Sequence, residues 1–107
     1  MQLVYGTEFE PRIATGNTLY ECIDKVHQHY VEHAREEIRQ LRIELAECMD
    51  AQEFGDISVV PVIEEINELI DYWLSVISKV RDTDNLVQLE KILDEYFEEG
   101  FFIRPVS

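Results

Sequence analysis

Basic residues are scarce in this chain: of its 107 residues, nine are Lys or Arg and 23 are Asp or Glu, which gives a formal net charge of −14. Seven acids and five bases lie at or before Arg42, whereas sixteen acids and four bases follow it, so the later part of the chain carries most of the negative field. Such a field repels nucleic acid and anionic membranes and attracts basic proteins. We therefore expect no direct binding of nucleic acid, and a basic protein or nucleoprotein complex as the partner.

Long apolar runs are also missing. No stretch approaches the ~18 apolar residues that a membrane span needs, and residues 1–20 lack the basic region and apolar stretch of a signal peptide. The length suits one domain with one core. The sequence therefore predicts a single soluble, cytoplasmic domain with no membrane partner.

Cysteine is limited to Cys22 and Cys48, which fall in one predicted helix. At ~1.5 Å per residue they are roughly 39 Å apart, far beyond the ~7 Å between Cα atoms that a disulfide allows. Unpaired thiols in a reducing compartment are expected. The chain also has no CxxC pair, glycine-rich phosphate loop or Ser, His and Asp arrangement, so we expect neither enzyme activity nor a cofactor.

Apolar residues recur in steps of three and four through three segments, which is the period of amphipathic helices. Thr18 with Glu21 forms a capping box before the first segment. Pro61 suits the first turn of the second, and Gly100 suits the end of the third. We predict an all-α fold, a small bundle of three to four helices with extended N- and C-terminal arms. The single acidic domain, 1–107, comprises an extended arm at 1–17, helices at 18–51, 58–81 and 84–99, and a tail at 100–107.

The first predicted helix is long. It would span about 50 Å, more than the width of a domain of this size. It must therefore kink, project or pair with another subunit. A structural subunit that forms a homodimer through this helix is one alternative that the sequence leaves open.

Acidic residues line one side of the second and third predicted helices. Residues four apart on a helix lie ~6 Å apart at Cβ, which is close to the separation of successive phosphates. Rows without a basic partner at i+4 cost stability, which favours a functional role over an ordinary solvated face. The candidate partner-binding residues are Glu64, Glu68, Asp71, Glu90, Asp94 and Glu98.

Histidines offer a weak metal motif. His29 and His33 are one turn apart on the first predicted helix, as imidazole pairs that share a metal are. A zinc site needs three to four ligands, and no third ligand has a fixed spacing here. No metal site is predicted.

A second carboxylate pattern suggests a different function. Glu36 and Glu37 with Gln40, followed by Glu53 and Asp56, resemble the metal-binding pattern of MazG-type nucleotide pyrophosphohydrolases, E-E-x-x-E and then E-x-x-D. Gln40 replaces one carboxylate, and the second half falls at the predicted helix break. A hard cation needs several well-placed oxygens. The resemblance implies a magnesium-dependent nucleotide hydrolase, which we keep as the alternative function.

Short, mostly acidic segments carry one further resemblance. Residues 67–71 (Asn-Glu-Leu-Ile-Asp), residues 94–99 (Asp-Glu-Tyr-Phe-Glu-Glu) and residues 18–20 (Thr-Leu-Tyr) with Cys22 are similar to the TomB-type Hha toxicity modulators. That family implies an acidic four-helix antitoxin-like protein that binds a small basic nucleoid protein, with Cys22 as a redox-sensitive position.

The leading hypothesis from the sequence is an acidic helical protein that inhibits or sequesters a basic, nucleic-acid-binding protein. Antitoxins, immunity proteins and phage anti-defence proteins, including anti-CRISPR proteins, act in this way. Carboxylate rows would occupy the phosphate-binding surface of the partner as a nucleic-acid mimic, while an exposed apolar patch fixes the pose.

Overall fold

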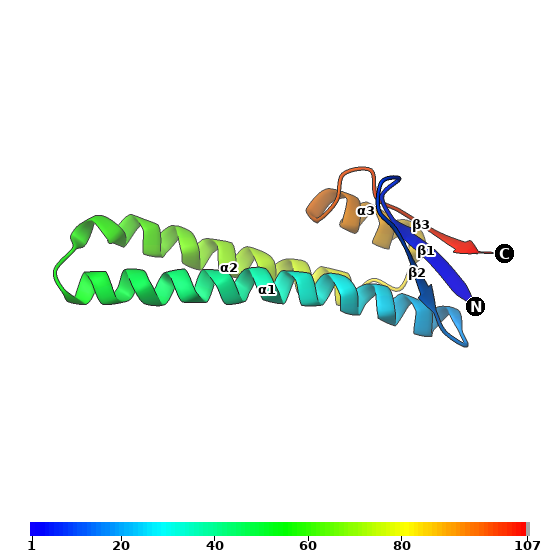
Figure 1. Cartoon of the computed structure of the whole chain (residues 1–107), viewed down its shortest axis with the longest axis horizontal. Coiled ribbons are helices and arrows are strands. Elements are labelled where there is room, and N and C mark those ends of the chain that lie inside the picture. The colour runs from blue at the N-terminus through cyan, green and yellow to red at the C-terminus, as the bar shows by residue number, and fades with distance from the viewer. Residues whose placement is uncertain (107) are drawn as a thin grey trace. The chain divides into compact units, whose positions relative to one another are not determined.

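A computed structural model describes residues 1–106 and shows an α+β fold, with helices and an antiparallel sheet (Figure 1). The elements are β1 (Gln2–Gly6), β2 (Pro11–Thr15), α1 (Leu19–Glu53), the 3-10 helix η1 (Ile57–Val59), α2 (Val60–Arg81), α3 (Leu86–Tyr96) and β3 (Phe102–Val106). The prediction of an all-α bundle is therefore wrong. Helices occur in the three segments with helical period, but the predicted arm and tail form a three-stranded sheet.

The sheet has the order β2-β1-β3, and both pairings are antiparallel. Leu3 and Tyr5 of β1 point into the core, and Ile103 of β3 lies opposite Tyr5 on the same face. A short turn joins β1 to β2, and it requires glycine at position 6, where φ is +121° and a Cβ would lie 2.4 Å from the backbone oxygen of Glu10. One face of the sheet is buried, and β1 contributes Leu3 and Tyr5 to it, β2 Ala14 and β3 Ile103.

The chain divides into two compact units. The sheet unit comprises residues 1–32 and 77–106 and contains the three strands, α3, the first part of α1 and the end of α2. The hairpin unit comprises residues 33–76 and contains the rest of α1 and α2. Among residues 1–106, no helix combines the length and apolar character needed to cross a bilayer.

The core of the sheet unit lies between the buried face of the sheet and the helices. Leu3, Val26, Leu89 and Leu93 are fully buried there. Aromatic rings complete it: Tyr30 packs edge-on against Phe97 and Phe101, with ring centroids 5.1 and 5.6 Å away. Such edge-on pairs add to the stabilisation from burial alone. The other buried side chains include Tyr5, Ala14, Cys22, Ile23, Ile77, Val80, Phe101 and Ile103.

Residues Thr18 and Glu21 cap the start of α1. The Glu21 amide donates to Thr18 Oγ1 at 3.2 Å, as a capping box requires. The Glu21 carboxylate accepts from the Asn17 amide at 2.6 Å instead of from Thr18. From this cap α1 continues for 35 residues, about 52 Å at 1.5 Å per residue. Cys22 and Cys48 both lie on it as free thiols, which confirms that they are unpaired.

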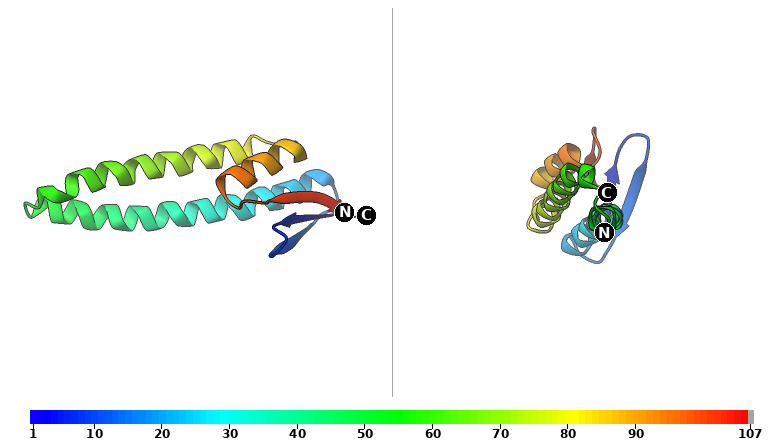
Figure 2. Two further views of the ribbon diagram at one scale, coloured as in Figure 1. Left: turned by 90° about the horizontal axis from the view of Figure 1, so that it is seen from above. Right: turned by 90° about the vertical axis from the view of Figure 1, so that its left-hand side faces the viewer.

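The hairpin unit consists of two antiparallel helical segments that lie side by side in both views of Figure 2. Ile38 of α1 and Ile66 and Ile70 of α2 are buried in the seam between them. The tip is exposed, with Phe54 91% and Ile57 81% accessible. Two helices leave both sides of their seam open, so several apolar residues there are only half-buried, namely Leu41, Leu45, Cys48, Val59 and Ile63.

Candidate functional site

The acidic row of α2 lies on the exposed side of the hairpin unit. Glu64, Glu68 and Asp71 are all exposed. At about 100° per residue they lie on the side of α2 opposite the buried Ile66 and Ile70, so their carboxylates point away from α1. Here the structure brings three of the six candidate residues onto one accessible helix face.

No base offsets the charge of this part of the chain. Between Arg42 and Lys79 the sequence contains no Lys or Arg. The acids in that interval are Glu44, Glu47, Asp50, Glu53, Asp56, Glu64, Glu65, Glu68 and Asp71. The carboxylates of this interval are therefore not offset by any base within it, and their potential falls off over about 8–10 Å at ordinary salt.

The acids of α3 bind the chain itself. Glu90 Oε1 accepts a hydrogen bond from the Ile103 amide of β3 at 3.3 Å. Asp94 Oδ1 accepts from the amides of Gly100 at 2.7 Å and Phe101 at 3.2 Å. These two carboxylates hold the loop and the strand that follow α3, because they accept from backbone amides that lie outside the helix.

Glu98, the third acid of this row, joins the sheet to the core. It lies beyond α3, which ends at Tyr96. Its carboxylate accepts from the Arg12 guanidinium of β2 at 3.4 Å and from the Tyr30 hydroxyl at 3.4 Å. Burial, together with the negative charge of Glu98, raises the pKa of Tyr30. The partner-binding role of Glu90, Asp94 and Glu98 stays a prediction, and each of them has a structural role that the sequence did not reveal.

Nothing near α3 in the sequence signals these structural contacts. The donors come from β2, α1, β3 and the loop that precedes β3, and none lies within four residues of its acceptor. Spacing along a helix reports only on neighbours three and four apart. Helical spacing therefore could not predict contacts with residues outside the helix.

The residues of the hydrolase pattern are spread along α1, except Asp56, which lies beyond its end and caps η1. Glu37 and Glu53 are both in α1, so about 24 Å of helix separates them. Glu36 accepts hydrogen bonds from Arg39 and Gln40. Two carboxylates this far apart cannot ligate one cation, whose oxygen ligands lie at about 2.0–2.6 Å.

Metal ligands do not cluster elsewhere in residues 1–106: no group of three or more His, Cys, Asp or Glu is placed to hold an ion. In the sheet unit His29 packs edge-on against Tyr30, with ring centroids 4.9 Å apart. In the hairpin unit His33 packs against Trp73, with centroids 6.3 Å apart. Both imidazoles take part in aromatic packing.

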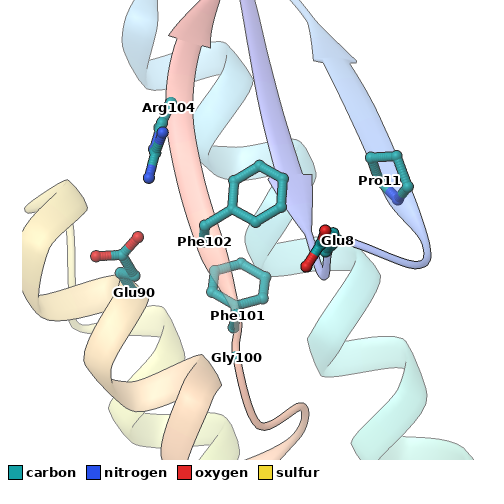
Figure 3. A pocket seen from close by; sticks show the side chains of 7 residues that line it. All are labelled: Glu8, Pro11, Glu90, Gly100, Phe101, Phe102 and Arg104. Atoms are coloured by element: carbon teal, nitrogen blue, oxygen red, sulfur yellow. The ribbon is translucent and has the colours of Figure 1, made fainter.

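A shallow hollow of about 730 Å³ lies beside β3 in the sheet unit (Figure 3). Phe102 stands at its centre, with Arg104 and Glu90 on one side and Glu8 and Pro11 on the other. The Arg104 guanidinium lies 5.7 Å from the Phe102 ring centroid, and Glu90 already binds a backbone amide. Among the residues that the structure describes, no buried side-chain N or O atom lacks a hydrogen bond. The hollow therefore holds no buried polar side-chain atom that lacks a partner.

A scan against protein-family models and searches of curated proteins and of solved structures found no match to this chain. The function has to be argued from its own residues. The exposed acidic row of α2, in an interval without Lys or Arg, is the feature that best distinguishes its surface.

Proposed function

We propose that this chain is an acidic binding protein that inhibits or sequesters a basic, nucleic-acid-binding protein in the cytoplasm. The observation that carries the proposal is the row Glu64, Glu68 and Asp71, which is exposed on α2 within an interval that contains nine acids and no base. The TomB-type resemblance implies a partner of the same kind.

The mechanism is competition for a phosphate-binding surface. Successive carboxylates of the row lie about 6 Å apart along the helix, so lysines and arginines that bind a phosphate backbone can bind them instead. The helix holds the row in place, so little side-chain ordering is needed beyond the carboxylates themselves. The surrounding charge speeds encounter with a basic protein, and this effect weakens as salt rises.

A charge-reversal experiment tests this function. The native partner is first captured at low salt, eluted with a salt gradient and identified by mass spectrometry. Changing Glu64, Glu68 and Asp71 together to Lys is expected to abolish its binding and to restore its nucleic-acid binding in a competition assay. The circular dichroism spectrum should stay unchanged, because all three side chains are exposed.

The matched control reverses three exposed acids of the sheet unit, Asp24, Glu95 and Glu99. It changes the net charge by the same amount. The proposal predicts that this variant retains most of its affinity. Equal losses in the two variants would show that net charge alone drives binding, and binding that is independent of salt would refute the proposal.

A further inference from the structure

Exposed apolar residues cover one flank of α2 in the hairpin unit. Val62, Leu69 and Tyr72 are each more than 40% accessible. At about 100° per residue they lie within a sector of roughly 80°, between the buried side of α2 and its acidic row. A flank of this kind is normally covered by a neighbouring helix.

Ring contacts show which side of α1 borders this flank. Trp73 packs against Tyr72, with centroids 5.5 Å apart, and against His33 of α1, 6.3 Å away. Residues on the His33 side of α1 follow in steps of three and four, and they include the exposed Glu37 and Glu44. The apolar flank of α2 and this acidic side of α1 therefore border the same opening of the seam.

The side chains at this opening are apolar in the middle, which we refer to as its floor, and include carboxylates at both edges, which we refer to as its walls. Half-buried Leu41, Cys48 and Trp73 line its floor. Glu37 and Glu44 stand on its α1 wall, and Glu65 lies among the apolar residues of the α2 wall. We call this surface the hairpin groove.

Basic residues are confined to other sides of the hairpin. Arg35 and Arg42 fall on the opposite flank of α1, roughly 160–200° around the helix from His33, and Arg39 on its outer side bonds to Glu36. No Lys or Arg lies in residues 43–76. The hairpin groove thus combines an apolar floor with carboxylate walls that no base neutralises.

We infer that the hairpin groove binds an amphipathic helix of the basic partner, which completes a three-helix bundle. The apolar stripe of such a helix would cover Leu69 and Trp73 at the usual interaxial distance of about 8–10 Å. Lysines and arginines on its two flanks would meet Glu37, Glu44 and Glu65. The inference rests on the proposed function, because it names the part of the partner that docks.

Charge decides between this occupant and a second copy of the chain. Two hairpin grooves placed face to face would bring the carboxylates of Glu37, Glu44 and Glu65 together without a counter-charge, which destabilises the contact. A basic helix supplies the missing charge and covers the same apolar area. The groove is therefore complementary to a basic helix and not to itself.

The experiment uses a synthetic Leu/Lys helix of about four turns as the probe, and the full-length protein. Trp73 is the only tryptophan in the chain and lies in the groove, so its fluorescence reports occupancy. We expect a blue shift on binding and an affinity that falls with salt. A Leu/Glu peptide of the same length should not bind.

Two leucine variants provide the matched comparison. Leu69 in the groove is 43% exposed, and Leu74 on the opposite flank of α2 is 46% exposed, so Leu69→Ala and Leu74→Ala remove similar surface and should leave the fold intact. Leu69→Ala is expected to weaken probe binding about tenfold, a difference of about 1.4 kcal/mol. Leu74→Ala should change it by less than about twofold. Equal effects of the two variants on probe binding, or binding without a change in Trp73 emission, would refute the proposal that the hairpin groove is the binding site.

The same variants separate failure of the groove from failure of the function. If the native partner loses binding on charge reversal of Glu64, Glu68 and Asp71 but is indifferent to Leu69→Ala, the proposed function stands and the groove is wrong. If Leu69→Ala weakens the partner while the charge reversal has no effect, the groove stands and the competition mechanism is wrong.

Discussion

Replacing Asp94 by alanine tests whether the α3 acids act within the fold. Its Oδ1 accepts from the amides of Gly100 and Phe101, so the change leaves the Gly100 amide without this acceptor and the Phe101 amide with only the carbonyl oxygen of Glu98, 3.1 Å away. Losing a comparable side-chain cap at a helix terminus costs about 0.5–2 kcal/mol. Because two amides are affected at an exposed site, we expect a loss of about 1–2 kcal/mol. At about 4 °C per kcal/mol, the melting temperature should fall by roughly 4–8 °C.

The control for this experiment is Glu95→Ala. Glu95 is the next residue on α3, is exposed and carries the same charge, so its loss changes the net charge equally. Its melting temperature should change by less than about 2 °C, the size of an ordinary surface substitution of up to ~0.5 kcal/mol. Asp94→Asn, which keeps an acceptor oxygen, should lie between the two. If Asp94→Ala melts at the same temperature as Glu95→Ala, the structural role assigned to Asp94 is wrong.

Three further experiments examine other parts of the fold. Tyr30 has a raised pKa, mainly through burial and then through the charge of Glu98. It therefore contributes stability that is present below about pH 10 and is lost as the pH rises above that value. The melting temperature of Tyr30→Phe should depend less on alkaline pH than that of the wild type, whereas Tyr20→Phe should behave as the wild type does. Leu93→Ala, at a fully buried position, should cost about 2–5 kcal/mol in chemical denaturation, and a smaller loss would contradict the packing described. Hydrogen bonds from the Ser58 side chain and amide lower the pKa of Asp56 below its ordinary 3.8. An NMR titration of Asp56 should therefore find a midpoint below this value, and Ser58→Ala should raise that midpoint.

The helices were predictable because their contacts are periodic along the chain. Ile66, Ile70 and Ile77 repeat on the buried side of α2, and such a repeat requires no knowledge of the rest of the fold. The end of α3 was less predictable. Gly100 has the positive φ expected after a helix, +83°, yet α3 ends earlier, at Tyr96, and Asp94 binds an amide of the loop that follows.

The sheet could not be found in the same way. Each strand is only five residues long, and β1 pairs with β3 across about a hundred residues of chain. The alternation of Leu3 and Tyr5 with Val4 hints at a half-buried strand, but five residues also fit an extended arm. Pro11 and Pro105 weakened the signal further, since proline cannot donate to a ladder and is tolerated only at edges.

The candidate site divides along similar lines. The exposure of Glu64, Glu68 and Asp71 follows from their positions opposite the apolar stripe of their own helix. The contacts of Glu90, Asp94 and Glu98 depend on two strands, on a loop and on Tyr30 of α1, none of which the spacing along the third helix predicts. Spacing along a helix therefore identified accessible carboxylates, but it could not distinguish them from carboxylates that form hydrogen bonds within the fold.

The pairing of β1 with β3 also has a consequence for the order of folding. During synthesis the hairpin segments, residues 33–76, are complete well before β3 is made, and their contacts are short-range and fast to form. β1 emerges first but has only β2 beside it until Phe102–Val106 follows. The apolar side chains Leu3 and Tyr5 thus stay incompletely covered through most of translation. In a pulse-labelling experiment on nascent chains, protection of the hairpin amides should precede protection of β1.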